Sequence, residues 1–101
     1  MRVMVFFDLP TLTSTNRRDY RRFRKYLVKN GFLMMQESVY CKLALNSTAS
    51  DAMMENLRKN KPPVGLVQMM CITEKQFAKI EFVIGRANST LINSVDRLVI
   101  I

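Results

Sequence analysis

Arg2-Val-Met-Val-Phe-Phe-Asp8 places five consecutive apolar residues between an arginine and an aspartate. The run is rich in β-branched and aromatic side chains, is apolar on both faces of an extended segment, and is too short for a buried helix. Such a segment is typical of a central strand that is covered on both sides. Pro10 ends it, and the polar residues 11–15 offer several N-caps for a following helix.

A helical period follows this strand. Between residues 14 and 30, Tyr20, Phe23 and Leu27 recur at i, i+3 and i+7 and define one apolar face. Gly31 stands directly after the pattern, where helices commonly end in a left-handed glycine. We therefore expect a helix over residues 14–30.

Strand and helix patterns alternate in the rest of the chain. Residues 32–45 are long for one strand, so we expect a bend or a tight hairpin near Glu37 and Ser38. A second helix is expected from about Thr48 to Asn60, because two prolines follow it. After it we expect an apolar strand, a short helical turn and two short strands, at residues 66–72, 73–78, 80–84 and 98–101.

The expected order of elements indicates the fold class. Strand, helix, two strands, helix and strand make the β-α-β-β-α-β pattern of a ferredoxin-like sandwich, an α+β fold with two helices on one face of an antiparallel sheet. The 101 residues are one domain's worth, residues 1–101. The C-terminal strands have no place in the minimal unit, so they are available for pairing with a second copy.

The charge balance indicates the class of partner. Sixteen Lys and Arg stand against eight Asp and Glu, which gives a net charge of +8 and a pI near 10.0. Such an excess favours polyanions, and nucleic acid is the usual one. Histidine is absent, which excludes Ser-His-Asp and Cys-His nucleophilic sites and His-ligated zinc.

The remaining composition points to a cytoplasmic protein that is not in a membrane. Cys41 and Cys71 are too few for a disulfide framework or a four-ligand zinc site, so we expect reduced core cysteines. No signal peptide is visible, and no apolar run approaches the roughly 18 residues of a membrane span.

Asp8 is the first candidate for chemistry. It is the only acidic residue among the first eighteen, and it ends an otherwise apolar strand. A carboxylate there is expected to lose hydration unless a metal ion, a hydrogen-bonded turn or a cation compensates. The structural alternative is an Asp8 that binds backbone amides of the turn at residues 9–11. One carboxylate is a poor Mg²⁺ site, so a metal-binding or catalytic Asp8 needs a second copy from a two-fold dimer.

The first helix is the second candidate. It carries seven Lys and Arg residues between positions 17 and 29 and a single acid, Asp19. Four of them, Arg18, Arg22, Lys25 and Lys29, are spaced by four, three and four residues. They form one stripe, called the outer stripe below, about 180° from the apolar face. A merely solvated face usually intersperses acids to relieve like-charge repulsion, so the stripe favours contact with a phosphate backbone, without sequence specificity. The nucleic-acid-binding candidates are Arg17, Arg18, Arg21, Arg22, Lys25 and Lys29.

Four stretches of the chain stand out together. They are the apolar strand ending in Asp8, the basic helix that leads to Gly31, the run Gln36-Glu-Ser-Val-Tyr40, and the segment Thr73-Glu-Lys-Gln-Phe-Ala78. In this order they resemble the Cas-two (Cas2) family of CRISPR-associated proteins, whose Q-x-S-V-F/Y signature is similar to the third stretch. The resemblance covers essentially the whole chain and is greatest for the branch found beside Cas9 (type II) systems.

The resemblance implies a homodimer of ferredoxin-like subunits that acts in spacer acquisition. In that role the dimer is a scaffold that bridges dimers of the Cas-one (Cas1) integrase and binds the phosphate backbone of the incoming double-stranded DNA. It also implies an alternative, because some relatives are Mg²⁺-dependent endonucleases that act on RNA or DNA. In that chemistry Asp8 of both subunits would hold one Mg²⁺ at the dimer axis and be the catalytic residue.

The residues themselves favour the scaffold. One candidate metal ligand per subunit and no histidine make a sparse active site. A dimer, by contrast, would have two copies of the basic helix and a net charge of +16, which is twice the +8 of one chain. A metal-dependent endonuclease, or a toxin-like ribonuclease of the same fold, is kept as the alternative. Whether the protein is an enzyme is therefore open at this point.

Overall fold

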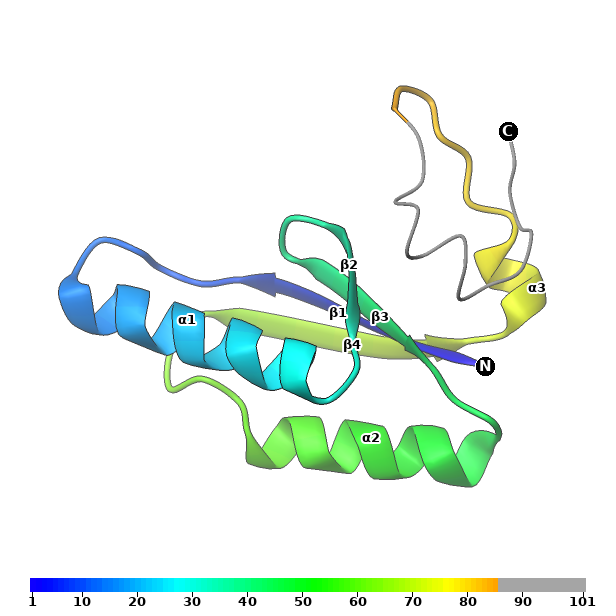
Figure 1. The fold of residues 1–101 in the computed structure, drawn as a ribbon, viewed down its shortest axis with the longest axis horizontal. Coiled ribbons are helices and arrows are strands. Elements are labelled where there is room, and N and C mark those ends of the chain that lie inside the picture. Colours follow the sequence, from blue (N-terminus) through cyan, green and yellow to red (C-terminus); the bar gives the residue numbers. More distant parts are fainter. Residues whose placement is uncertain (86–101) are drawn as a thin grey trace.

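The computed structural model describes residues 1–85, and its elements follow the expected order (Figure 1). They are β1 (Arg2–Asp8), α1 (Ser14–Lys29), β2 (Leu33–Gln36), β3 (Val39–Leu43), α2 (Ser47–Lys59), β4 (Leu66–Ile72) and α3 (Glu74–Phe77). The fold is α+β, with a four-stranded antiparallel sheet and helices, as in a ferredoxin-like sandwich. The predicted fold class is confirmed.

β1 lies inside the sheet, whose strand order is β2-β3-β1-β4. It pairs antiparallel with β3 on one side and with β4 on the other, and its last residue, Asp8, lies opposite Leu66. β2 pairs with β3 and forms one edge of the sheet. The prediction of a central first strand is therefore confirmed.

Helices α1 and α2 lie on the same face of the sheet (Figure 1). The apolar side chains that point to this face make the main core, in which the rings of Phe7 and Phe23 meet edge to face with centroids 5.2 Å apart. Each such buried side chain contributes about 1.5–3 kcal/mol to folding. The fully or nearly buried members are Val3, Val5, Phe7, Leu9, Phe23, Leu27, Phe32, Tyr40 and Leu57. This is the packing that the helical spacing of Phe23 and Leu27 predicts.

Local sequence signals set the ends of the elements. Thr13 forms a capping box with Asn16, in which each side chain accepts a hydrogen bond from the other residue's backbone N–H. Gly31 follows α1 with φ +86°, as expected for a glycine at a helix end. The hairpin between β2 and β3 turns at residues 37–38, where Ser38 has φ +67°.

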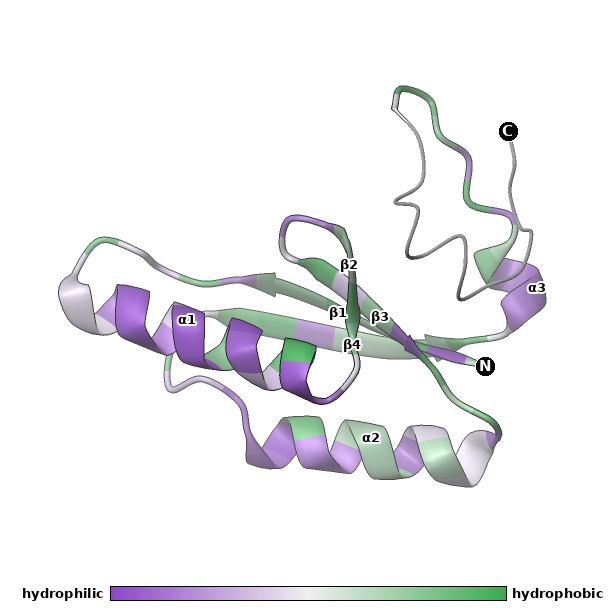
Figure 2. Ribbon diagram, in the orientation of Figure 1, coloured by the Kyte–Doolittle hydropathy of each residue, from purple (hydrophilic) through white to green (hydrophobic). Residues whose placement is uncertain are grey.

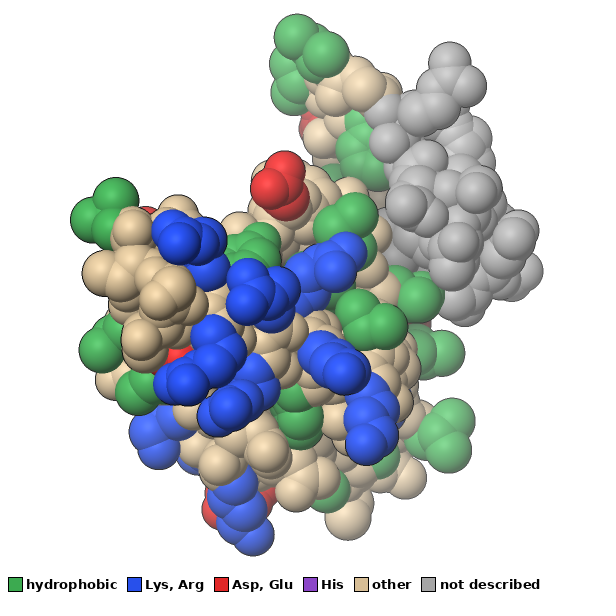
Figure 3. All heavy atoms as spheres, turned by 60° about the vertical axis from the view of Figure 1, so that its left-hand side comes forward, with side chains coloured by type: hydrophobic (Ala, Val, Ile, Leu, Met, Phe, Trp, Pro, Cys, Tyr) green, Lys and Arg blue, Asp and Glu red, His purple; other side chains and the backbone are tan. Residues whose placement is uncertain are grey.

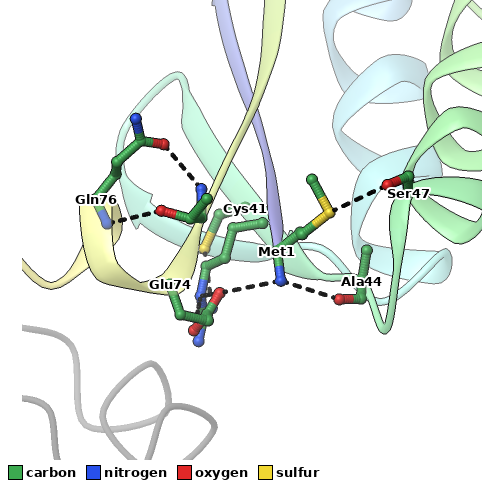
Figure 4. Close-up of polar contacts among 8 residues, drawn as sticks. Met1, Cys41, Ala44, Ser47, Glu74 and Gln76 are labelled. Atoms are coloured by element: carbon green, nitrogen blue, oxygen red, sulfur yellow. Dashed lines mark hydrogen bonds and ion pairs between the residues drawn. The ribbon is translucent and has the colours of Figure 1, made fainter.

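The opposite face of the sheet, called the open face below, carries the alternate residues of each strand. Met4, Cys41 and Phe77 of α3 form a smaller buried cluster there. Arg2 attaches α3 to this face, because its side chain is 1% exposed, its Nε lies 3.2 Å from the Glu74 carboxylate and its guanidinium lies 4.3 Å from the centre of the Phe77 ring. Figure 4 shows Glu74 beside Met1 and Cys41. The N-terminal ammonium group donates to the carbonyl oxygen of Ala44 and faces the same carboxylate.

One strand prediction is wrong. Residues 80–84 form no strand in the structure, although they were expected to do so. Their backbone finds no partner strand among residues 1–85, and Val83 and Ile84 are about nine-tenths exposed, at 90% and 93%. Extended apolar sequence becomes a strand only when a neighbour accepts its hydrogen bonds. The other expected short strand, 98–101, lies outside the described residues.

Both cysteines in the described part of the chain are free thiols, as expected. Cys41 is buried in the centre of the sheet, and this burial raises the pKa of its thiol despite a hydrogen bond from Arg2. A thiol that stays protonated and inaccessible is a poor nucleophile. Among residues 1–85, none of the helices combines the length and the apolar character that a bilayer crossing needs.

Candidate nucleic-acid interface

The predicted nucleic-acid-binding residues are all exposed on α1. Phe23 and Leu27 of the same helix are buried against the sheet, so the basic side chains point outward. We call these six residues the basic face: Arg17, Arg18, Arg21, Arg22, Lys25 and Lys29. Lys and Arg side chains gather into a broad patch over this end of the molecule (Figure 3), and hydrophilic bands run along α1 above a largely apolar sheet (Figure 2).

Few counter-charges neutralise this face. The one acid of α1, Asp19, lies 3.7 Å from Arg18, whose side chain is 60% exposed, and an exposed pair of this kind contributes little. Within residues 1–85, Arg22, Lys25 and Lys29 make no ion pair. The cationic groups therefore stay free for an anionic partner.

The placement of charge on α1 works against the helix dipole. The first turn of α1 has no acidic residue, and Arg17 and Arg18 follow it directly. The N-terminal end of a helix favours negative side chains, by about 0.3–1 kcal/mol each. A sequence optimised for helix stability alone would place acids here. The arrangement instead suits an external anion, such as a phosphate, which the same end of the helix attracts.

Arg17 also has a structural contact. Its Nη1 donates hydrogen bonds to the carbonyl oxygens of Thr11 and Leu12, at 3.1 and 3.2 Å. These bonds tie the segment after β1 to the start of α1. Arg17 is therefore partly committed to the loop, whereas the other residues of the basic face are not.

Two further basic residues of this region were not predicted from the sequence. Arg24 is exposed on α1, and its Nε donates to the hydroxyl group of Tyr40 at 3.0 Å. Lys42 of β3 donates to the carbonyl oxygen of Asn30, at the end of α1. Arg24 lies off the outer stripe, as Arg17 and Arg21 do, and it was counted among the seven basic residues of the helix but not named as a candidate. The repeated spacing from Arg17 to Arg21 and Arg24, four and then three residues, is the signal that places it on a second row.

Asp8 lies at the end of β1 and is exposed. Alternation along the strand puts it on the open face with Met4 and Phe6, away from α1 and α2. The expectation that its carboxylate loses hydration is therefore wrong, because the strand end reaches solvent. The structural alternative also fails, since within residues 1–85 its side chain makes no hydrogen bond, to the following turn or elsewhere.

Within residues 1–85, Asp8 is not part of a cluster of metal-binding side chains. No group of three or more His, Cys, Asp or Glu side chains with the spacing of a metal site occurs among residues 1–85. Asp8 also lies on the opposite face of the sheet from α1, so the structure does not bring it together with the basic face. In the single chain, the two sets of candidate residues therefore lie on opposite sides of the sheet.

Comparisons with known proteins identify the family of this chain. The family model described as "CRISPR associated protein Cas2" matches residues 1–80. A protein of Treponema denticola is 52% identical over 101 residues, which are the whole of both chains. Proteins of Streptococcus mutans serotype c (44% identical over 98% of this chain and 91% of that one) and Lacticaseibacillus rhamnosus (43% identical over the whole of both) are similar too. All three are named "CRISPR-associated endoribonuclease Cas2". The chain therefore belongs to the Cas2 family of CRISPR-associated proteins.

Proposed function

We propose that this protein is a homodimeric scaffold of CRISPR spacer acquisition, which binds the phosphate backbone of the incoming DNA duplex and bridges Cas1 integrase dimers. The observation that carries the proposal is the basic face, because its side chains are exposed and mostly without counter-charges. Phosphate contacts of this kind hold a duplex in place and do not read its sequence. That property suits a protein that must accept DNA of any sequence.

The open face supports the homodimer. Two of its β4 side chains, Leu66 and Met70, are 55% and 47% exposed, and α3 covers the other end of the face. Within residues 1–85, β4 is also an edge strand, and no strand of this part of the chain pairs with its outer backbone groups. A second copy is the occupant that the family resemblance implies. We expect Met70→Lys, which puts a charge into that apolar face, to convert a dimer into monomers in analytical ultracentrifugation.

Spacer integration tests the scaffold directly. Purified Cas1 integrase, a short duplex and a plasmid that contains the repeat are combined without this protein, with the wild type, and with Asp8→Ala. We expect both forms of the protein to stimulate integration, because the proposed role uses the basic face and not Asp8. Stimulation by the wild type alone would place Asp8 in the mechanism. Absence of stimulation by either form would refute the scaffold.

The second candidate function is a Mg²⁺-dependent endoribonuclease, and the printed names of the relatives favour it. The donor set fits Mg²⁺ only in a dimer. Asp8 offers exposed carboxylate oxygens, which Mg²⁺ prefers, but among residues 1–85 it belongs to no group of three or more metal-binding side chains. When bound, Mg²⁺ would activate water and neutralise charge on a phosphodiester. Asp8 would hold the metal, and its position on the open face lets two packed copies bring their Asp8 side chains to one place.

The nuclease candidate has a clean test. Asp8 is exposed and makes no hydrogen bond within residues 1–85, so Asp8→Ala should leave the circular dichroism spectrum and the unfolding midpoint unchanged. Cleavage of RNA that needs Mg²⁺ and disappears in this variant would establish the second function. Cleavage that persists in Asp8→Ala would exclude Asp8 as the metal ligand.

A further inference from the structure

Arg24 differs from the other basic residues of α1 in how it is held. Its Nε donates to the Tyr40 hydroxyl group at 3.0 Å, a hydrogen bond that joins α1 to β3. Tyr40 is itself fixed, because its side chain is 1% exposed and its ring stacks on Phe7 with centroids 5.7 Å apart. The guanidinium group of Arg24 is therefore tied to a buried residue of the main core.

This bond leaves the outer edge of the guanidinium group unoccupied. An arginine has five N–H donors, and the Tyr40 contact uses the one on Nε. Within the described residues, the Nη atoms of Arg24 make no hydrogen bond or ion pair, and the residue is exposed. Two parallel N–H donors on a planar fork match the geometry of two phosphate oxygens.

We infer that Arg24, held by Tyr40, is a pre-positioned phosphate-binding residue, and that the nucleic-acid backbone crosses α1 on the flank that faces β3. The inference rests on the proposed binding of a DNA duplex and deepens it. Arg22, Lys25 and Lys29 have no comparable anchor within residues 1–85, so each must lose side-chain freedom when it binds. Ordering a long side chain at an interface costs affinity, and Arg24 has met this cost already in the free protein.

A second anchored arginine lies on the same flank. Arg17, Arg21 and Arg24 are spaced by four and three residues, so they form one row about 100° away from the middle of the outer stripe. The first member, Arg17, is held by the carbonyl oxygens of residues 11 and 12, and the last by Tyr40. Both ends of the row are thus fixed to other elements, which suits a contact that must set the position of a duplex.

A double-mutant cycle on Arg24 and Tyr40 tests the inference. The dissociation constant of a fluorescein-labelled 30-base-pair duplex is measured by anisotropy at several salt concentrations for the wild type, Arg24→Gln, Tyr40→Phe and the double variant. Arg24→Gln should weaken binding about tenfold and reduce the slope of log K against log salt by about 0.9, the value for one lost phosphate contact. Tyr40→Phe keeps the ring and the charge, so it should weaken binding about fivefold with the slope unchanged. The double variant should be no weaker than Arg24→Gln, because the hydroxyl group acts through Arg24.

Arg22→Gln is the matched control, because it removes the same charge from an unanchored position of the same helix. It should reduce the slope equally but weaken binding only about threefold. If Tyr40→Phe does not fold, as judged by circular dichroism, Arg24→Lys replaces it. This variant keeps the charge and loses the fork, and should weaken binding about fivefold with the slope unchanged.

The outcomes separate the inference from the function on which it rests. A wild-type protein that does not bind the duplex would overturn the proposed function. The inference alone would be overturned if the wild type binds the duplex but the anchor has no effect. In that case Arg24→Gln and Arg22→Gln would have the same dissociation constant, and Tyr40→Phe or Arg24→Lys would have that of the wild type. Equal and independent losses from Arg24→Gln and Tyr40→Phe that add in the double variant would also overturn it, because they would show that the two residues do not act together.

Discussion

Reversing the charge of two residues on the basic face should abolish tight duplex binding without unfolding the protein. The perturbation is Arg18→Glu combined with Arg22→Glu. Both side chains are exposed on the outer stripe of α1, and the one ion pair between them and the described residues is the weak contact of Arg18 with Asp19. Exposed substitutions of this kind usually change the free energy of unfolding by less than about 0.5 kcal/mol each.

The effect on binding is much larger than the effect on stability. Each substitution changes the charge by two units, so the net charge of the chain falls from +8 to +4. If each arginine contacts one phosphate, the slope of log K against log salt falls by about 1.8. The two new carboxylates also repel the backbone. Together these effects should weaken binding by about 100-fold at 0.15 M salt, since the two lost contacts cost about threefold each and the repulsion by two carboxylates adds about tenfold.

The assay is fluorescence anisotropy with a labelled duplex over a salt series, accompanied by circular dichroism and urea unfolding. The control is Lys75→Glu with Lys79→Glu, which brings the net charge to the same +4 but changes exposed residues in and after α3, on the other face of the sheet. The control should bind within about threefold of the wild type, because only screened, long-range attraction is lost. Equal losses in the two double variants would refute the reasoning, since net charge and not the basic face would then govern binding.

Four further outcomes follow from the structure. Glu74→Gln removes the carboxylate that faces the buried guanidinium of Arg2, and should lower the free energy of unfolding in urea by about 1–3 kcal/mol; an unchanged midpoint would mean that Arg2 needs no counter-charge. Gly65→Ala should cost about 1–3 kcal/mol in thermal unfolding, because Gly65 has φ +104° and an added Cβ would meet backbone 3.0 Å away; full stability would argue against this turn geometry. A thiol reagent should modify Cys71 in the folded protein and Cys41 only after denaturation. Burial raises the pKa of the Cys41 thiol above its unfolded-state pKa of about 8.5. The stability that the protonated thiol contributes is therefore fully present below that pKa and decreases as the pH rises above it. Cys41→Ala should remove this decrease in the free energy of unfolding between pH 8 and 9.5.

Much of the fold was predictable because it depends on local signals. The apolar run of β1, the helical spacing of Phe23 and Leu27, and the glycine at position 31 each act over a few residues. The basic face was predictable for the same reason, since residues at i, i+3 and i+4 share a side of a helix whatever the helix packs against. Residues 80–84 were mispredicted because a strand also needs a partner, and local sequence does not supply one.

The burial and the hydrogen-bond partners of each candidate residue could not be predicted from the sequence. Asp8 follows five apolar residues, which suggested a desolvated carboxylate, yet the end of β1 lies at the open face and its side chain is exposed. Arg24 and Tyr40 are sixteen residues apart and on different elements, so no spacing rule joins them. The Arg2–Glu74 pair spans 72 positions and likewise exists only because β1 and the start of α3 come together.

Local sequence was enough to predict most of the helices and strands and the basic character of α1, which favours an anionic partner. These properties arise from backbone propensity, periodicity and summed charge, which need no knowledge of distant residues. Only the three-dimensional packing shows that Asp8 is exposed in the single chain, on the other face of the sheet from α1, and that Arg24 is hydrogen-bonded to the core residue Tyr40. Burial and hydrogen-bond partners depend on which distant elements pack together, and that packing places Tyr40 under Arg24 and leaves Asp8 at an open edge.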